Sequence, residues 1–189
     1  MLAIVVPAFC QVIEYEANGL KYQTLTKSGV TIMFATLPPH VRGYTILQVA
    51  IANGSRAPYV IRPEDFSFTR NDGSVVSGAT AQSVISMLIS KGGRNDVIKL
   101  VTTYEAALYG IPHMRLNNGY EERRQAALAL TSTKLKAAAA ASALALVQTK
   151  LVPGESTDGA VFFPTEGKPL GPGRLQVHTN TDFFQFNAE

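Results

Sequence analysis

The segment from Gly154 to Gly159 reads Gly-Glu-Ser-Thr-Asp-Gly and has the residue types of the turn that presents a nucleophilic serine in hydrolases. That turn needs glycines two residues before and two after the serine, a strand before it and a helix after it. Here Asp158 takes the second glycine position, a helical pattern and Pro153 come before, and a strand pattern follows. We therefore predict a tight turn and no nucleophile at Ser156, with Gly159 permitting a close backbone approach.

Three histidines, His40, His113 and His178, are the residues best suited to bind a metal or to move a proton. They lie far apart, and none has a cysteine or carboxylate at metal-ligand spacing. The single cysteine, Cys10, excludes a disulfide within the chain and a cysteine-based metal site. The glycine-rich, basic segment 91–95 follows a helix pattern, whereas a phosphate-binding loop leads from a strand into a helix. We assign no catalytic, cofactor-binding or metal-binding residue and expect no cofactor.

Local structure accounts for the other polar clusters. Asp65 and Asp72 flank a predicted hairpin, where aspartate side chains stabilise turns. Asn53-Gly54-Ser55 matches a glycosylation sequon, but Asn-Gly is more simply a turn. Glu121-Glu122-Arg123-Arg124 indicates the solvated start of a helix, with the carboxylates near its positive end. An ionic contact of this segment with a partner is the alternative.

Composition indicates a folded domain. The 189-residue chain is 46% hydrophobic, which is enough for a core, and its charged fraction of 16% is too low for a disordered chain. The formal net charge is +3, and no Lys/Arg cluster is interleaved with aromatic residues, so we expect no nucleic-acid partner. No later stretch reaches the roughly 18 apolar residues of a transmembrane helix.

The first ten residues, MLAIVVPAFC, indicate export. Leu2 to Val6 is an apolar run, Pro7 breaks it, and small residues stand at −3 and −1 of a cleavage after Cys10. We predict that residues 1–10 are the remnant of a signal peptide whose basic opening segment lies upstream. Lipid attachment at Cys10 is a weaker alternative, because Phe9 stands where a small residue is normally found. An ordinary N-terminal strand over residues 2–6 is the other alternative.

Residues 11–77 are predicted to be β-rich, because β-branched and aromatic residues alternate with polar ones between turn residues. The predicted strands are Leu20–Thr26, Val30–Leu37 (ended by Pro38-Pro39), Tyr44–Ala52, Tyr59–Ile61, Phe66–Thr69 and Val75-Val76. In the strongest strand, one face carries Thr45, Leu47, Val49 and Ile51, and the other carries Ile46, Gln48, Ala50 and Ala52. We expect the first, more apolar set to face the core.

The middle of the chain changes to helical spacing. The predicted helices are Ala79 to Lys91, a second from a cap at Asp96 to Gly110, and a long third from about Gly119 to Val147. In the third, two series repeat every seven residues, Leu128/Leu135/Ser142 and Leu130/Ala137/Leu144. The five alanines at 137–141 let this helix lie close on the sheet or on its neighbours. Alternatively, the two seams receive a helix of a second chain.

The end of the chain returns to strand patterns at 159–163, 175–178 and 183–186. Neither the early nor the late strands alone would close a good sandwich. We therefore predict one β-sandwich domain over residues 11–189, with a helical insertion at about 79–147.

Two sets of sequence segments resemble segments of bacterial extracytoplasmic immunoglobulin-like domains. The first is Tyr44 to Ser55 with Pro58, Asp65–Phe68 and Asp72-Gly73, and the second is Leu151 to Pro164. The resemblance covers roughly residues 20–77 and 150–187, and it leaves out the helices. It implies a mainly β protein with α-helices, an immunoglobulin-like sandwich with a large helical insertion between early and late strands. It implies no catalytic residue, since such sandwiches serve many roles.

From these features we expect a non-catalytic binding or assembly module of the bacterial cell envelope that is secreted, periplasmic or at the cell surface. Its partner would be an unidentified protein or a second copy, and peripheral attachment to the envelope is compatible with the sequence. One alternative is a self-assembling subunit of a surface polymer, joined by helix pairing or by donation of residues 11–26 as a strand. The second alternative is an enzyme with an unrecognised site.

Overall fold

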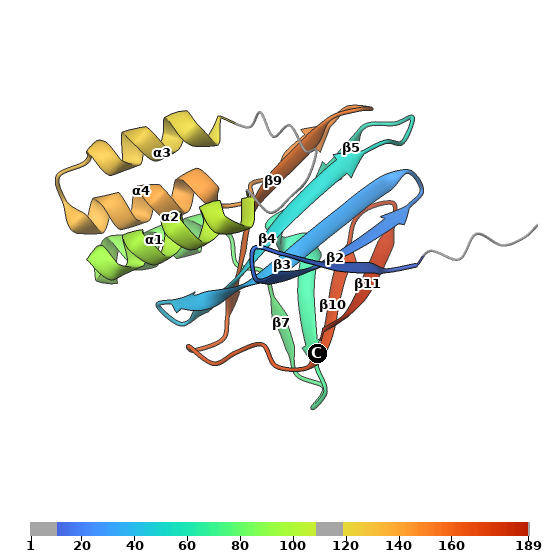
Figure 1. Cartoon of the computed structure of the whole chain (residues 1–189), viewed down its shortest axis with the longest axis horizontal. Coiled ribbons are helices and arrows are strands. Elements are labelled where there is room, and N and C mark those ends of the chain that lie inside the picture. Colours follow the sequence, from blue (N-terminus) through green and yellow to red (C-terminus); the bar gives the residue numbers. More distant parts are fainter. Residues whose placement is uncertain (1–10, 109–118, 189) are drawn as a thin grey trace, which may run out of the picture.

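The computed structural model of the chain describes residues 11–108 and 119–188. Within these ranges, seven strands come first, four α-helices follow, and four strands complete the chain (Figure 1). The early strands are β1 (Ile13–Ala17), β2 (Leu20–Lys27), β3 (Val30–Val41), β4 (Tyr44–Asn53), β5 (Tyr59–Ile61), β6 (Phe66–Arg70) and β7 (Val75–Ser77). The helices are α1 (Ala81–Lys91), α2 (Arg94–Leu108), α3 (Tyr120–Ala129) and α4 (Thr133–Leu144). The late strands are β8 (Thr149–Leu151), β9 (Ser156–Pro164), β10 (Gly173–His178) and β11 (Phe183–Ala188).

The described strands are antiparallel and form two main sheets. The central sheet has the order β1-β2-β3-β4-β9, and the outer sheet has the order β11-β10-β6-β7. A separate pair, β5-β8, lies beside them. Both main sheets combine early and late strands, since β9 pairs with β4 and β10 pairs with β6. The chain is therefore mainly β, as predicted, with the helices between β7 and β8 in sequence.

One apolar core lies between the two sheets. It contains Leu47, Val49 and Ile51 of β4, the face that the sequence predicted to be buried. The outer sheet contributes aromatic and aliphatic side chains, among them Phe68 and Phe186. Phe186 packs edge-on against Phe34 of β3, with ring centroids 5.1 Å apart.

A second core lies between the other face of the central sheet and the helices. It contains Ile46 and Ala50 of β4, so both faces of that strand are buried. The expected face does meet the core, and the opposite face, to which the sequence analysis assigned no core, is buried as well. The helix that contacts this face of the sheet is mainly α2, whereas α4, whose Ala137 and Ala141 are fully buried, packs against the other three helices. Gln48 lies on the same face, fully buried, and neither polar atom of its amide has a hydrogen-bond partner in the described structure.

Strand β3 continues past its predicted end at Leu37. Pro38-Pro39 does not end the strand, because β3 runs on to Val41 with a shift in its pairing to β4 between Leu37 and Val41. An irregularity of this kind accommodates prolines, which cannot donate a ladder hydrogen bond.

The helical layer differs from prediction in its longest element. The predicted helix over 119–147 is two helices, because the chain breaks at Leu130 and restarts at Ser132, whose side chain caps α4. The two seven-residue series therefore do not lie along one helix. Leu135 is exposed, whereas Ala137 and Leu144 are buried inside this chain. The seam proposed for a second chain is thus not continuous.

The first two helices begin close to where the sequence predicted. Thr80 caps α1, accepting a hydrogen bond from Ser83 N at 3.2 Å. Asp96 lies in the first turn of α2, not at its cap, and its carboxylate accepts from Gly93 N at 2.8 Å. The helix N-terminus in segment 91–95 is therefore already occupied by a carboxylate. None of the described helices is both long and apolar enough to span a membrane.

Candidate functional site

The turn from β8 to β9 contains Gly154 and Glu155, as predicted, but it is shorter than predicted, because Ser156 to Gly159 already belong to β9. Gly154 has φ +87°, and its N–H donates to Asn53 O at 2.7 Å. The Glu155 carboxylate accepts from Val152 N at 2.9 Å, which closes the turn. Ser156 is the first residue of β9, so the order is strand, turn, strand. This order lacks the helix that a nucleophile elbow requires.

The described histidines lie away from Ser156. His40 makes a 3.0 Å hydrogen bond between its Nδ1 and the Thr45 hydroxyl, near the β3–β4 turn. His178 packs against Phe183, with ring centroids 4.4 Å apart. His113 and Cys10 lie outside the described residues, as does the whole of segment 1–10. Among the described residues, no group of three or more His, Cys, Asp or Glu side chains could hold a metal ion.

The other polar residues have the local roles that the sequence predicted. Asp72 accepts from Ser74 N at 2.8 Å, and Asp65 accepts from Arg62 N at 2.8 Å. Asn53 is buried, and its Nδ2 donates to Ala57 O and Leu151 O. A buried, bonded amide is part of the turn and is not accessible for glycosylation.

The outer edge of β9 is covered along only part of its length. Ala79 N donates to Phe162 O at 2.7 Å, and Leu146 N donates to Ala160 O at 2.9 Å. At Gly159 the backbone approach is very close, since a Cβ there would lie 2.6 Å from Leu146 Cα. This confirms the predicted role of Gly159. Before Gly159, towards Ser156, the edge of β9 lies against a pocket.

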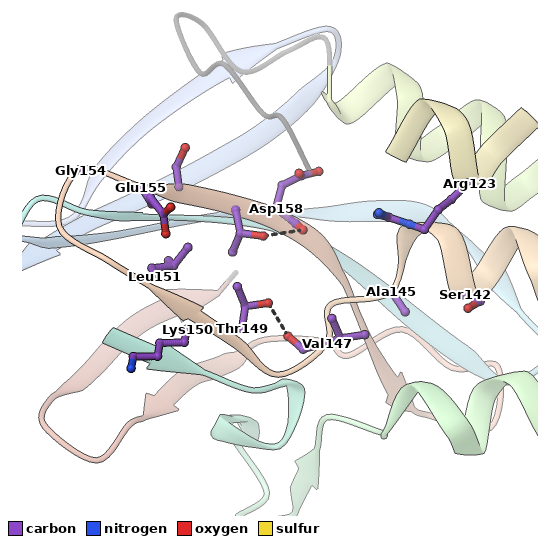
Figure 2. A pocket seen from close by; sticks show the side chains of 12 residues that line it. Arg123, Ser142, Ala145, Val147, Thr149, Lys150, Leu151, Gly154, Glu155 and Asp158 are labelled. Atoms are coloured by element: carbon purple, nitrogen blue, oxygen red, sulfur yellow. Dashed lines mark hydrogen bonds between the residues drawn. The ribbon is translucent and has the colours of Figure 1, made fainter. Parts of the chain in front are cut away.

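This β9-edge pocket has a volume of about 780 Å³ and lies between the β8–β9 turn and the ends of two helices (Figure 2). Its described lining consists of Arg123, Ser142, Ala145, Val147, Thr149, Lys150, Leu151, Gly154, Glu155, Ser156, Thr157 and Asp158. Most of these side chains are polar, and charges of both signs are present. The pocket is therefore suited to a ligand that forms hydrogen bonds.

Tertiary contacts hold two of the charged groups of the pocket. Arg123 donates to Ala143 O near the end of α4, from Nε at 3.3 Å and from Nη2 at 3.1 Å. Asp158 is buried on β9 and accepts a hydrogen bond from the phenol of Tyr104 on α2. Burial, and then the neighbouring Asp158 carboxylate, raises the pKa of Tyr104 well above its ordinary value. The Tyr104 hydroxyl therefore stays protonated and remains a donor.

The sequence identified part of this pocket and missed the rest. It singled out segment 154–159 as a turn, but nothing local indicated that the edge of β9 faces a pocket. Arg123 was placed on a solvated helix start, and the structure shows it in the lining. Its neighbour Arg124 pairs with Glu105 of α2, so it joins two helices of this chain.

Comparison of the chain with models of protein families, with curated proteins and with solved structures finds no match. The interpretation of the pocket therefore depends on its own residues.

Proposed function

We propose that this chain is a non-catalytic binding module of the bacterial cell envelope, an immunoglobulin-like β-sandwich with a helical insertion. In this proposal an extended segment of a partner protein binds in the β9-edge pocket. The extracytoplasmic location is supported by the N-terminal MLAIVVPAFC segment and the low charged fraction of the chain. The sandwich assignment is supported by the apolar core shared by two antiparallel sheets.

The observation that carries the proposal is the position of Ser156 on the β9 edge. Ala160 O and Phe162 O accept hydrogen bonds from outside the sheet, so the even-numbered residues of β9 direct their backbone groups away from β4. Because this alternation has a period of two, the N–H and C=O of Ser156 face the pocket. A strand edge beside a pocket is suited to an added strand, whose main chain gives affinity and whose side chains give specificity.

The charges of the pocket would select the added segment. Lys150 is exposed on β8, and Glu155 is exposed in the turn. They provide one charge of each sign within the lining, beside Arg123 and Asp158. A segment with acidic and basic side chains would complement this arrangement better than an apolar one.

Donation of residues 11–26 to a neighbouring chain is less well supported. In this chain these residues supply β1 and β2 of the central sheet, with Tyr22 fully buried. The Tyr22 hydroxyl also donates to Ala107 O of α2 at 2.6 Å. A donor strand would have to give up these contacts, whereas binding at β9 leaves them intact.

The proposal is tested by substituting Ser156 in two ways. Ser156→Pro removes the outward N–H but keeps the pairing of β9 with β4, because proline is tolerated where an edge N–H faces outward. Ser156→Ala removes only the hydroxyl. We expect co-purification of a partner from native cells with the wild type and Ser156→Ala, and a loss with Ser156→Pro.

Lys150→Glu provides a second, independent variant, because this exposed side chain can be changed without disturbing a core. Thermal unfolding by circular dichroism shows whether each variant is folded. Equal capture of the same partner by the wild type, Ser156→Pro and Lys150→Glu would contradict the proposal. So would turnover by the pure protein that one polar substitution abolishes.

A further inference from the structure

Four helix ends gather at one end of the helical layer, and we call them the helical tip: residues 89–94 and 129–136. Lys134 Nζ at the start of α4 donates to Ser90 O near the end of α1, at 2.9 Å. A Cβ on Gly92 would lie 3.1 Å from the Cβ of Ala137, which brings the α1–α2 connection against α4. Figure 1 shows this end of the helices projecting away from both sheets.

The helical tip is strongly basic. It carries Lys91, Arg94, Lys134 and Lys136, none of which forms an ion pair with a described residue. Over residues 78–104 and 127–147, Asp96 is the only acidic residue of the sequence. Asp96 is buried and pairs with Arg42 at 2.8 Å, so it does not offset these four charges.

The helical tip also exposes large apolar side chains. Ile89 and Leu135 are each 48% exposed, and Leu130 is 38% exposed. They come from the end of α1, the α3–α4 connection and the first turn of α4. The fold of this chain covers only part of each of these apolar side chains, and the remainder is exposed among polar and cationic residues.

We propose that the helical tip docks on an anionic lipid bilayer surface. Cationic side chains near such a surface are attracted to headgroup phosphates, and apolar side chains beside them reach the acyl boundary. The combination distinguishes this surface from a nucleic-acid site, because no aromatic side chain at the tip is available to stack on a base. The inference deepens the proposed envelope function by naming the surface that would attach the module. It requires no occupant of the β9-edge pocket.

The test is flotation of the whole protein with vesicles of neutral phosphatidylcholine, alone or with anionic phosphatidylglycerol. We expect binding to the anionic vesicles alone, weakened by salt. Lys134→Gln with Lys136→Gln should weaken binding about 25-fold, since each lysine near such a surface contributes about fivefold. Leu130→Ser with Leu135→Ser should also weaken it.

Matched controls change cationic and aliphatic side chains elsewhere on the surface. Arg56→Gln with Lys168→Gln removes two exposed cations, and Val75→Ser replaces an exposed apolar side chain on β7. Both controls should bind like the wild type, and circular dichroism confirms that each variant is folded. Equal binding of wild type to neutral and anionic vesicles would overturn the inference, as would unchanged binding by the Lys134/Lys136 variant. A wild-type protein that captures the β9 partner but binds neither kind of vesicle would overturn this inference alone.

Discussion

The phenol of Tyr104 on α2 donates a hydrogen bond to the carboxylate of Asp158 on β9, and both side chains are buried. This bond joins the helical layer to the strand that borders the β9-edge pocket. Tyr104→Phe should therefore lower the free energy of unfolding by about 1.5–3 kcal/mol, the range for hydrogen bonds to charged groups. Urea unfolding measures the change.

Tyr22→Phe is the matched control for this prediction. The Tyr22 hydroxyl is also buried, but its acceptor is the neutral Ala107 carbonyl, at 2.6 Å. Its loss should cost about 0.5–1.5 kcal/mol. An equal decrease in the free energy of unfolding for the two variants would show that the Tyr104–Asp158 hydrogen bond stabilises the fold no more than a bond to a neutral acceptor.

Stability should fall in alkaline solution. Burial, and secondly the neighbouring Tyr15, raises the pKa of Tyr22 from 10.0 to about 12. Between these values the unfolded chain loses the Tyr22 proton while the folded chain keeps it, so the free energy of unfolding decreases as pH rises. Tyr22→Phe should make this decrease less steep in urea unfolding. If the free energy of unfolding of Tyr22→Phe decreased with pH as steeply as that of the wild type, the pH dependence could not be assigned to Tyr22.

Gly159→Ala should detach the 145–148 segment from β9. An added Cβ would lie 2.6 Å from Leu146 Cα and 2.7 Å from Leu146 N, so backbone must move, at a cost of about 1–3 kcal/mol. Hydrogen exchange at the Leu146 amide, which bonds Ala160 O, should become faster. Gly154→Ala is the control: its φ of +87° makes alanine strained there, but its Cβ would meet nothing within 4 Å, so the Leu146 amide should stay protected.

Gln48→Met should stabilise the protein. The Gln48 amide is fully buried and neither polar atom has a partner in the described structure, an arrangement that costs about 1–3 kcal/mol. Methionine has a similar shape and no such requirement. A loss of stability would mean that a bound water or another group holds the amide.

Leu144→Ala and Leu135→Ala should lower the free energy of unfolding by very different amounts. Leu144 is 2% exposed in the helix–sheet core, so its truncation should cost about 2–5 kcal/mol. Leu135 is 48% exposed, and its truncation should change stability by less than about 0.5 kcal/mol. Similar costs in thermal unfolding would contradict the placement of α4.

Local patterns predicted most of the strands because their signals are local, although β1 and β8 were not among the predicted strands. The alternation in Tyr44–Asn53 and the Ser28-Gly29 turn, with φ of 53° and 82°, need no distant partner to be recognised. The burial of both faces of β4 was missed, because Ile46 and Ala50 alone do not indicate that helices cover that face. The helix break at Leu130 was missed because the leucine repeat runs across it, although Ser132 is a capping signal.

The pocket could be predicted only in part. Pro153 and Gly154 made its turn visible, whereas the early start of β9 at Ser156 was not predicted. Its remaining lining joins residues far apart in sequence, such as Arg123 and Asp158. Their meeting depends on how α3 packs against α4 and how β9 pairs with β4, and neither arrangement has a local signature.

The most direct test of the central claim is native mass spectrometry of the protein gently extracted from its native cells. We predict a mass lacking residues 1–10 and a co-eluting partner with the wild type and Ser156→Ala. With Ser156→Pro, the same processed chain should appear alone. An unprocessed monomer for all three proteins would contradict an exported module that binds a partner strand at the edge of β9.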